Sequence, residues 1–316
     1  LIEGVTLPAL GGAMSPPPYK SAYLARNANG SGTNWAIAIG GPAILFVDVD
    51  DMTVDAGGNL LFIVRAAILA DTLHIGNLLS IPAGGGPSSA ILIKLDSQGN
   101  LLWSKILGGN ISAANLLTDS NDDFYFAGWQ AGSITLDTLT IDPTYGSQAN
   151  FLSKLDANGN FLWGKSFGSK SSMGQIMKSA INAQNELFLS GGWEGDTIFI
   201  DNLIAVNPTP GGFFNTDRYI AKFDAIGNAL WIQREGGLEI EYPSALQVTS
   251  GGGVMAYSTI ADSTSMTING GAATVQGPKV LFSSYDSQGM LSWYNAIAHG
   301  LEDNPGLFEF TGDGTN

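Results

Sequence analysis

The sequence predicts an all-β protein, a β-propeller of four-stranded antiparallel blades, and three observations support this. A hairpin motif with an Asp-x-x-Gly turn and a closing tryptophan occurs four times. The aspartates of these copies, at positions 96, 156, 224 and 286, are 60, 68 and 62 residues apart. Convincing amphipathic helices are missing from the sequence. A period of this length exceeds that of most helical repeats and fits four strands with their loops, which is one blade.

The recurring hairpin is the second of two tight turns in each repeat. An aspartate that opens such a turn accepts hydrogen bonds from backbone N–H groups two residues on, and the glycine supplies the positive φ that closes it. Because the tryptophan recurs in every repeat, we expect it to pack between blades. The four copies are Ile93–Trp103, Ser153–Trp163, Ala221–Trp231 and Ser283–Trp293, and a degenerate copy, Ala25–Trp35, precedes them.

An earlier tight turn follows an apolar stretch in each repeat. These turns lie in Met52–Phe62, Leu116–Phe126, Ala180–Leu189 and Gln247–Ala256. Each repeat therefore runs strand, tight turn, strand, long loop, strand, tight turn, strand. Since alternate connections of an antiparallel meander lie at opposite ends, we expect all tight turns on one face and the long loops 68–90, 129–149, 192–217 and 259–279 on the other. Short alternating stretches in the loops are expected to add small hairpins.

The repeats fill nearly the whole chain, which favours a single domain over residues 1–316. Four complete blades are predicted at about 50–109, 113–169, 177–237 and 244–300, with part-blades at 1–49 and 301–316. Two interpretations of the ends stay open. The part-blades join as a five-bladed closure, or the chain is an excerpt of a larger propeller.

The two hairpins together resemble the SBBP-type β-propeller repeat of bacteria, which is frequent in exported and cell-surface proteins of Bacteroidetes. The matching residues are the apolar-Lys-Leu-Asp-x-x-Gly-Asn-x-x-Trp hairpin, as in Ser153–Trp163, and the earlier Val-Asp-x-x-Gly-Asn-x-x-Phe hairpin, as in Val54–Phe62. Asn27 and Ser284 depart from the pattern. The resemblance implies the propeller fold and an extracellular or cell-surface location. It implies no catalytic residues, because the family has no single activity.

Composition excludes some classes of function. The net charge of −15 opposes binding of nucleic acid, whose phosphates are also negative. The chain has no cysteine, so disulfides and thiolate metal sites are excluded. No apolar run is long enough for a membrane span, and the first residues do not resemble a signal peptide.

Three motifs are weighed as sites and set aside. Gly159–Ser166 satisfies the P-loop pattern formally, but the window crosses a hairpin turn and no helix follows it. The Asp-x-x-Gly-Asn turns resemble calcium loops but offer one carboxylate each, so we expect plain Asx turns without a cofactor, and calcium binding is the alternative. His74 and His299 lack a second ligand at zinc spacing.

The candidate ligand-binding residues lie around the long loops. Trp129 and Trp193 occupy equivalent positions at the loop starts, where they either stack on sugar rings or cap the blade core. Nearby acids would serve a glycosidase if two of them faced each other at about 5–10 Å. The candidate residues are Trp129, Trp193, Glu194, Asp196, Glu239 and Glu241.

The sequence favours a non-catalytic, extracellular or cell-surface module for binding, adhesion or assembly of a surface structure. Its expected partner is a protein or glycan on the long-loop face or at the blade edges, and self-assembly is a further expectation. A carbohydrate-active enzyme with acids on the long-loop face and a lectin built on the two tryptophans are the alternatives.

Overall fold

The computed structural model describes residues 21–27, 35–41, 44–68, 72–82, 89–169, 174–207, 216–236, 241–260, 265–268, 273–276 and 279–298. All 24 regular elements in these ranges are β-strands, and their pairings are antiparallel. The predicted all-β antiparallel class is confirmed. The described residues include no helix that could cross a membrane.

Four repeat sheets, which we number I to IV, each contain four strands in the order of the chain. Sheet I contains β3 (Ile44–Val54), β4 (Leu60–Ile68), β7 (Ser89–Leu95) and the first part of β8 (Leu101–Thr118). Sheet II contains the rest of β8, β9 (Phe124–Leu136), β11 (Gln148–Leu155) and β12 (Phe161–Ser169). Sheet III contains β13 (Gly174–Ile181), β14 (Leu187–Glu194), β17 (Thr216–Phe223) and β18 (Ala229–Gly236). Sheet IV contains β19 (Glu241–Val248), β20 (Val254–Ile260), β23 (Lys279–Tyr285) and β24 (Leu291–Ala298).

An N-terminal hairpin of β1 (Ala22–Arg26) and β2 (Trp35–Gly40) precedes sheet I. The strand β3 begins at Ile44, within the stretch that the sequence assigns to the first part-blade. The strand β8 is shared, because its first part pairs with β7 and its second part pairs with β9. Sheets I and II are therefore joined by one continuous strand.

Short hairpins form in the long loops, as the alternating stretches predict, but each reaches back to the preceding sheet. The strand β5 pairs with β2, the end of β9 with β8, β15 with β12, and β21 with β18. Each unit thus adds strands to the last strand of the unit before it. The hairpin strands are β5 (Thr72–Ile75), β6 (Leu79–Pro82), β10 (Leu139–Ile141), β15 (Thr197–Ile200), β16 (Leu203–Val206), β21 (Ser265–Ile268) and β22 (Ala273–Gln276).

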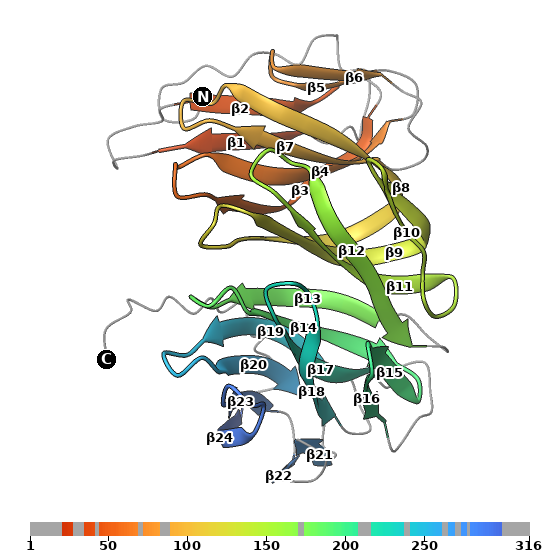
Figure 1. Cartoon of the computed structure of the whole chain (residues 1–316), viewed down its shortest axis with the longest axis vertical. Helices are drawn as coiled ribbons and strands as arrows, with labels where there is room; N and C mark the ends of the chain where they lie inside the picture. Colours follow the sequence, from red (N-terminus) through yellow and green to blue (C-terminus); the bar gives the residue numbers. More distant parts are fainter. Residues whose placement is uncertain are drawn as a thin grey trace.

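The sheets follow one another along the molecule, from the N-terminal hairpin to sheet IV (Figure 1). Four hydrophobic clusters lie between successive sheets, and alternate residues of one strand enter different clusters. In β4, Phe62 and Val64 belong to the first cluster, whereas Leu61 and Ile63 belong to the second. Because both faces of this part of the strand are buried, the run from Leu60 to Val64 is apolar and shows no polar alternation.

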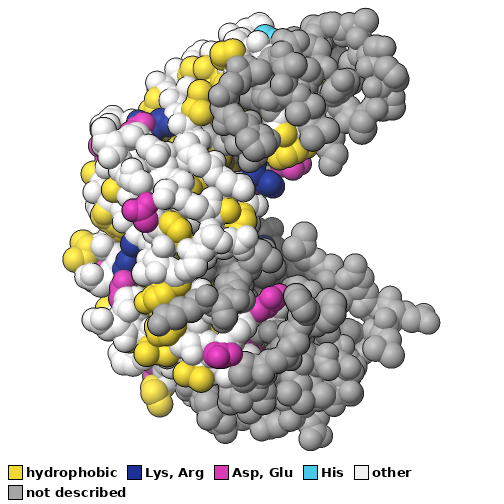
Figure 2. All heavy atoms as spheres, turned by 90° about the vertical axis from the view of Figure 1, so that its right-hand side faces the viewer, with side chains coloured by type: hydrophobic (Ala, Val, Ile, Leu, Met, Phe, Trp, Pro, Cys, Tyr) yellow, Lys and Arg dark blue, Asp and Glu magenta, His cyan; other side chains and the backbone are white. Residues whose placement is uncertain are grey.

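In the view of Figure 2, the described residues form one continuous curved surface. Over the described residues, no strand pairing connects the N-terminal hairpin with sheet IV. The structure therefore shows the antiparallel repeat sheets but does not show the closed ring of a propeller. Residues 1–20 and 299–316, which include most of the predicted ends, lie outside the described residues.

Candidate binding surfaces

The second tight turn of each repeat is held by its aspartate. In the turn of sheet II, Oδ1 of Asp156 accepts the backbone N–H groups of Asn158 (2.9 Å) and Asn160 (2.8 Å), and Oδ2 accepts Nδ2–H of Asn160 at 2.8 Å. Slight burial opposes ionisation, but these hydrogen bonds outweigh it and lower the pKa of Asp156. Both carboxylate oxygens are thus used by the turn itself. The described residues contain no group of three or more His, Asp or Glu side chains arranged to hold a metal.

A lysine of the recurring motif ties the two tight turns of its own sheet together. Nζ of Lys94 lies 2.9 Å from Oδ2 of Asp55 in sheet I, and Nζ of Lys222 lies 2.8 Å from Oε2 of Glu186 in sheet III. The same lysines donate to the next sheet, Lys94 to the carbonyl of Ala157 (3.0 Å) and Lys222 to that of Ser287 (3.2 Å). The tight turns of neighbouring sheets therefore share one face of the molecule.

The recurring tryptophans pack against the turn of the following sheet. A Cβ added to Gly289 would lie 2.7 Å from the indole of Trp231, and one added to Gly99 would lie 2.9 Å from that of Trp35. The indole N–H groups donate to backbone carbonyls of the same turns, from Trp231 to Ser287 at 3.2 Å. Between sheets II and III the corresponding carbonyl, of Ala225, instead accepts the hydroxyl of Tyr125 at 2.9 Å.

The two candidate stacking residues are placed differently. The indole of Trp193 is fully buried and lies 6.3 Å from the ring of Tyr219 in the core between sheets II and III. It caps the core and offers no ring face to a sugar. Trp129 is half-buried in β9, opposite Asn150 of β11.

The candidate acids do not assemble into a described catalytic pair. Glu194 is half-buried at the end of β14, and Asp196 is exposed in the turn that follows. Glu239 lies outside the described residues, and of Glu241 only the backbone is described, as the first residue of β19. Glu194 and Asp196 are close in the sequence, but no contact between their side chains is seen among the described residues.

Sheet III contains two buried ion pairs that the sequence analysis missed. Nη1 of Arg218 lies 2.9 Å from Oε2 of Glu235, whose other oxygen accepts the hydroxyl of Tyr285 at 2.6 Å. Asp217 pairs with Arg234, and burial raises the pKa of Asp217 to about 6 against the opposing effect of Arg234. Adjacent opposite charges in strands that are otherwise apolar were the signal available in the sequence. Glu235 is thus held in the core, where none of its side chain is exposed.

The last strand carries an exposed apolar surface. In sheet III, Trp231 is only 8% exposed, whereas its counterpart Trp293 in β24 is 46% exposed. Met290, Tyr294 and Ile297 are also exposed. We call these four residues the β24 surface. Because Trp293 and Tyr294 are neighbours in the strand and point to opposite faces, this edge strand exposes apolar side chains on both of its faces. Exposed apolar side chains that gather in this way are typical of interaction sites.

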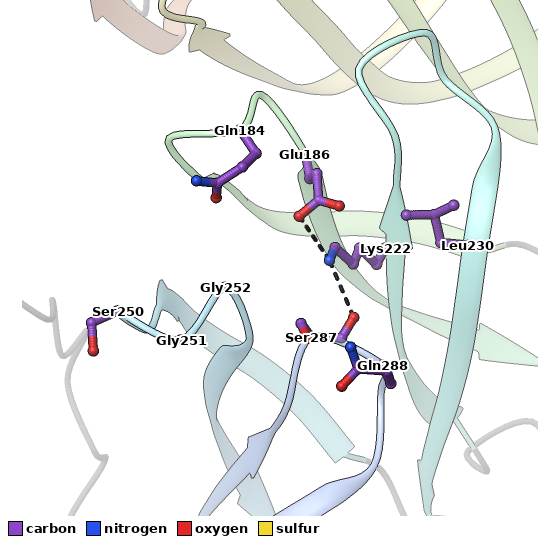
Figure 3. Close-up of a pocket in the computed structure, with 9 residues that line it drawn as sticks. All are labelled: Gln184, Glu186, Lys222, Leu230, Ser250, Gly251, Gly252, Ser287 and Gln288. Carbon is purple, nitrogen blue, oxygen red and sulfur yellow. Dashed lines mark hydrogen bonds and ion pairs between the residues drawn. The ribbon is translucent and has the colours of Figure 1, made fainter.

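A cleft of about 450 Å³ opens on the tight-turn face between sheets III and IV (Figure 3). Glu186 and Lys222 of sheet III line one side, and the turns around Gly252 and Ser287 of sheet IV line the other. Sequence reasoning placed ligands on the opposite face. The available signal was the Thr249-Ser-Gly-Gly-Gly253 turn, which lacks the Asp, Asn and Glu side chains of the equivalent turns.

The chain was compared with protein families, curated proteins and solved structures. No protein-family model matches the chain, and no curated protein matches it. A crystal structure of a protein of unknown function from Bacteroides caccae is similar at 11% identity and a TM-score of 0.32, covering 89% of this chain and 94% of that one. The resemblance to the SBBP-type repeat therefore stays a prediction.

Proposed function

We propose that this chain is a non-catalytic β-propeller module of the bacterial cell surface or exterior, and that it functions in binding and assembly. The extracellular location rests on the resemblance of its two hairpins to the SBBP-type repeat. Assembly is supported by one observation above all, the exposure of the β24 surface. We propose that a second copy of the chain covers this surface.

The occupant is inferred from the interfaces between the repeat sheets. Along the chain, a tryptophan packs on the glycine turn of the next repeat, as Trp35, Trp103, Trp163 and Trp231 do. The last strand of a unit also accepts a short hairpin from the next unit. Within the described residues, Trp293 has no following turn and β24 has no such hairpin. The matching partner for this surface is therefore another repeat of the same kind.

The N-terminal hairpin of a second molecule is the repeat best suited to this place. Its strands β1 and β2 precede sheet I. Its strand β1 exposes Tyr23. Joining the C-terminal surface of one molecule to the N-terminal hairpin of the next is a heterologous contact, which produces rings or filaments.

Sedimentation velocity over a range of protein concentrations tests this proposal. The wild-type protein is expected to self-associate with rising concentration, and Trp293→Ser to remain monomeric. Ile226→Ser provides the matched control, because Ile226 is 71% exposed and belongs to a turn of sheet III, not to sheet IV. A wild type that stays monomeric at every concentration contradicts assembly through a second copy. So does a Trp293→Ser protein that associates like the wild type.

A further inference from the structure

The first tight turns of neighbouring sheets are linked by a repeated hydrogen bond. The backbone N–H of Ala56 in sheet I donates to Oδ1 of Asp122 in sheet II at 2.7 Å. One sheet further, the N–H of Ser120 donates to Oδ1 of Asn185 at 3.0 Å. Asp122 and Asn185 occupy the same turn position and share a left-handed backbone, with φ of 61° and 60°. A side-chain oxygen at this position thus closes the gap between one turn and the next.

The same position in sheet IV is occupied by Gly252. The φ of Gly252 is 76°, which is also left-handed, and its N–H donates to the carbonyl of Thr249 at 3.0 Å, as in the equivalent turns. Glycine has no side chain, so the N–H of Ala183 in sheet III has no oxygen to donate to from this position. The cleft of about 450 Å³ lies at this junction. A Cβ added at Gly252 would meet only Ser287, at 3.8 Å, so the space is open.

The charge in the cleft is balanced. Lys222 is paired with Glu186 at 2.8 Å and also donates to the carbonyl of Ser287 at 3.2 Å (Figure 3). The other polar lining comes from uncharged side chains such as Gln184 and Gln288, and Leu230 adds an apolar wall. A carboxylate entering the cleft would be repelled by Glu186, whereas an uncharged acceptor would not.

We propose that this cleft binds a carboxamide group, whose carbonyl oxygen accepts the N–H of Ala183 in place of the side-chain oxygen that Gly252 lacks. The amide of Asn185 provides the precedent within the chain, because it fills the equivalent gap one sheet earlier. Two sources carry this chemistry, an N-acetylated sugar and an asparagine side chain. The proposal does not depend on self-association through β24.

Saturation-transfer difference NMR tests the proposal with two probes, N-acetylglucosamine and N-acetyl-asparagine amide. Glucose serves as the probe without a carboxamide. The wild-type protein is expected to transfer saturation to at least one carboxamide probe, and the probe that responds identifies the source. Gly252→Asn is expected to abolish the signal, because asparagine tolerates a left-handed backbone and fills the gap.

Two further variants complete the test. Ile226→Ser changes an exposed residue that does not line the cleft, so it is expected to bind like the wild type. Asn185→Gly opens the equivalent gap between sheets II and III and is expected to increase the signal. Equal signals from the wild type and a folded Gly252→Asn protein overturn the proposal. No signal from either carboxamide probe, or an equal signal from glucose, also overturns it.

Discussion

Trp231 of sheet III covers Gly289 of sheet IV so closely that a single added methyl group would overlap the indole. The same contact joins Trp35 to Gly99, Trp103 to Gly159 and Trp163 to Gly227. An aromatic ring of each sheet therefore packs against the turn of the next sheet. Glycine is needed in that turn for its left-handed backbone and because a larger residue would overlap the ring.

The loss of stability when the recurring tryptophan is replaced by alanine is expected to depend on whether a further sheet packs against the ring. Trp231→Ala removes a buried ring and should lower the free energy of unfolding by about 3–5 kcal/mol. Trp293→Ala removes a half-exposed ring and should cost less than about 1 kcal/mol for the monomer. Urea unfolding at a concentration where the protein is monomeric measures both values. Equal losses would show that β24 does not differ from the strands inside the stack.

Substitution of the covered glycine tests the other half of the contact. Gly227→Ala forces a Cβ to within 2.5 Å of Trp163 at a φ of 88°, and should destabilise the protein by about 2 kcal/mol or more. Gly251→Ala, with nothing within 4 Å of its added Cβ, should change stability by less than about 0.5 kcal/mol. Thermal unfolding followed by circular dichroism compares the two. A neutral Gly227→Ala variant would mean that the indole can move aside.

The ion pair between Asp55 and Lys94 predicts a loss of stability in acid. Burial of Asp55 opposes ionisation, but hydrogen bonds from Lys94 and Asn59 outweigh it and lower the pKa of Asp55 below its ordinary 3.8. The stabilisation is therefore present above pH 3.8 and is lost as the pH falls through the lowered pKa. Asp55→Asn should be less stable than the wild type at pH 7 by about 1–3 kcal/mol.

The difference between Asp55→Asn and the wild type should shrink when chemical unfolding is repeated at progressively lower pH. Asp196→Asn is the control, because Asp196 is exposed. A constant difference between Asp55→Asn and the wild type across the acid range would contradict the assigned role of the charge.

The buried pair between Arg218 and Glu235 predicts opposite results for one and for two substitutions. Glu235→Gln leaves the guanidinium of Arg218 buried without its counter-charge and should destabilise the protein by about 3–5 kcal/mol. Replacing both residues by leucine removes the two charges together and should cost much less, since a buried ion pair contributes little against an apolar pair. Urea unfolding of the single and double variants decides this. A double variant as unstable as the single one would show that the ion pair itself stabilises sheet III.

The repeat and its turns could be predicted from the sequence because they depend on local chemistry. Asp156 accepts hydrogen bonds from residues two and four positions later, and Gly159 adopts a left-handed backbone. The turn is therefore defined by the consecutive residues from Asp156 to Asn160. The all-β class and the small hairpins in the long loops follow from similarly short patterns. Trp193 was ambiguous for the opposite reason, since a tryptophan at a loop start has the same neighbours in sequence whether its ring is buried or exposed.

Strand pairing across sheets depends on how distant parts of the chain meet in space. The strands, the tight turns and the recurring tryptophan could be inferred from the sequence alone, because each depends on residues close together in the chain. The sequence did not determine that β5 would pair with β2, that Arg218 and Glu235 would meet in the core, or that a cleft would lie between Gln184 and Gly252. These features join positions tens of residues apart, and their geometry is fixed by how the sheets twist and pack against one another.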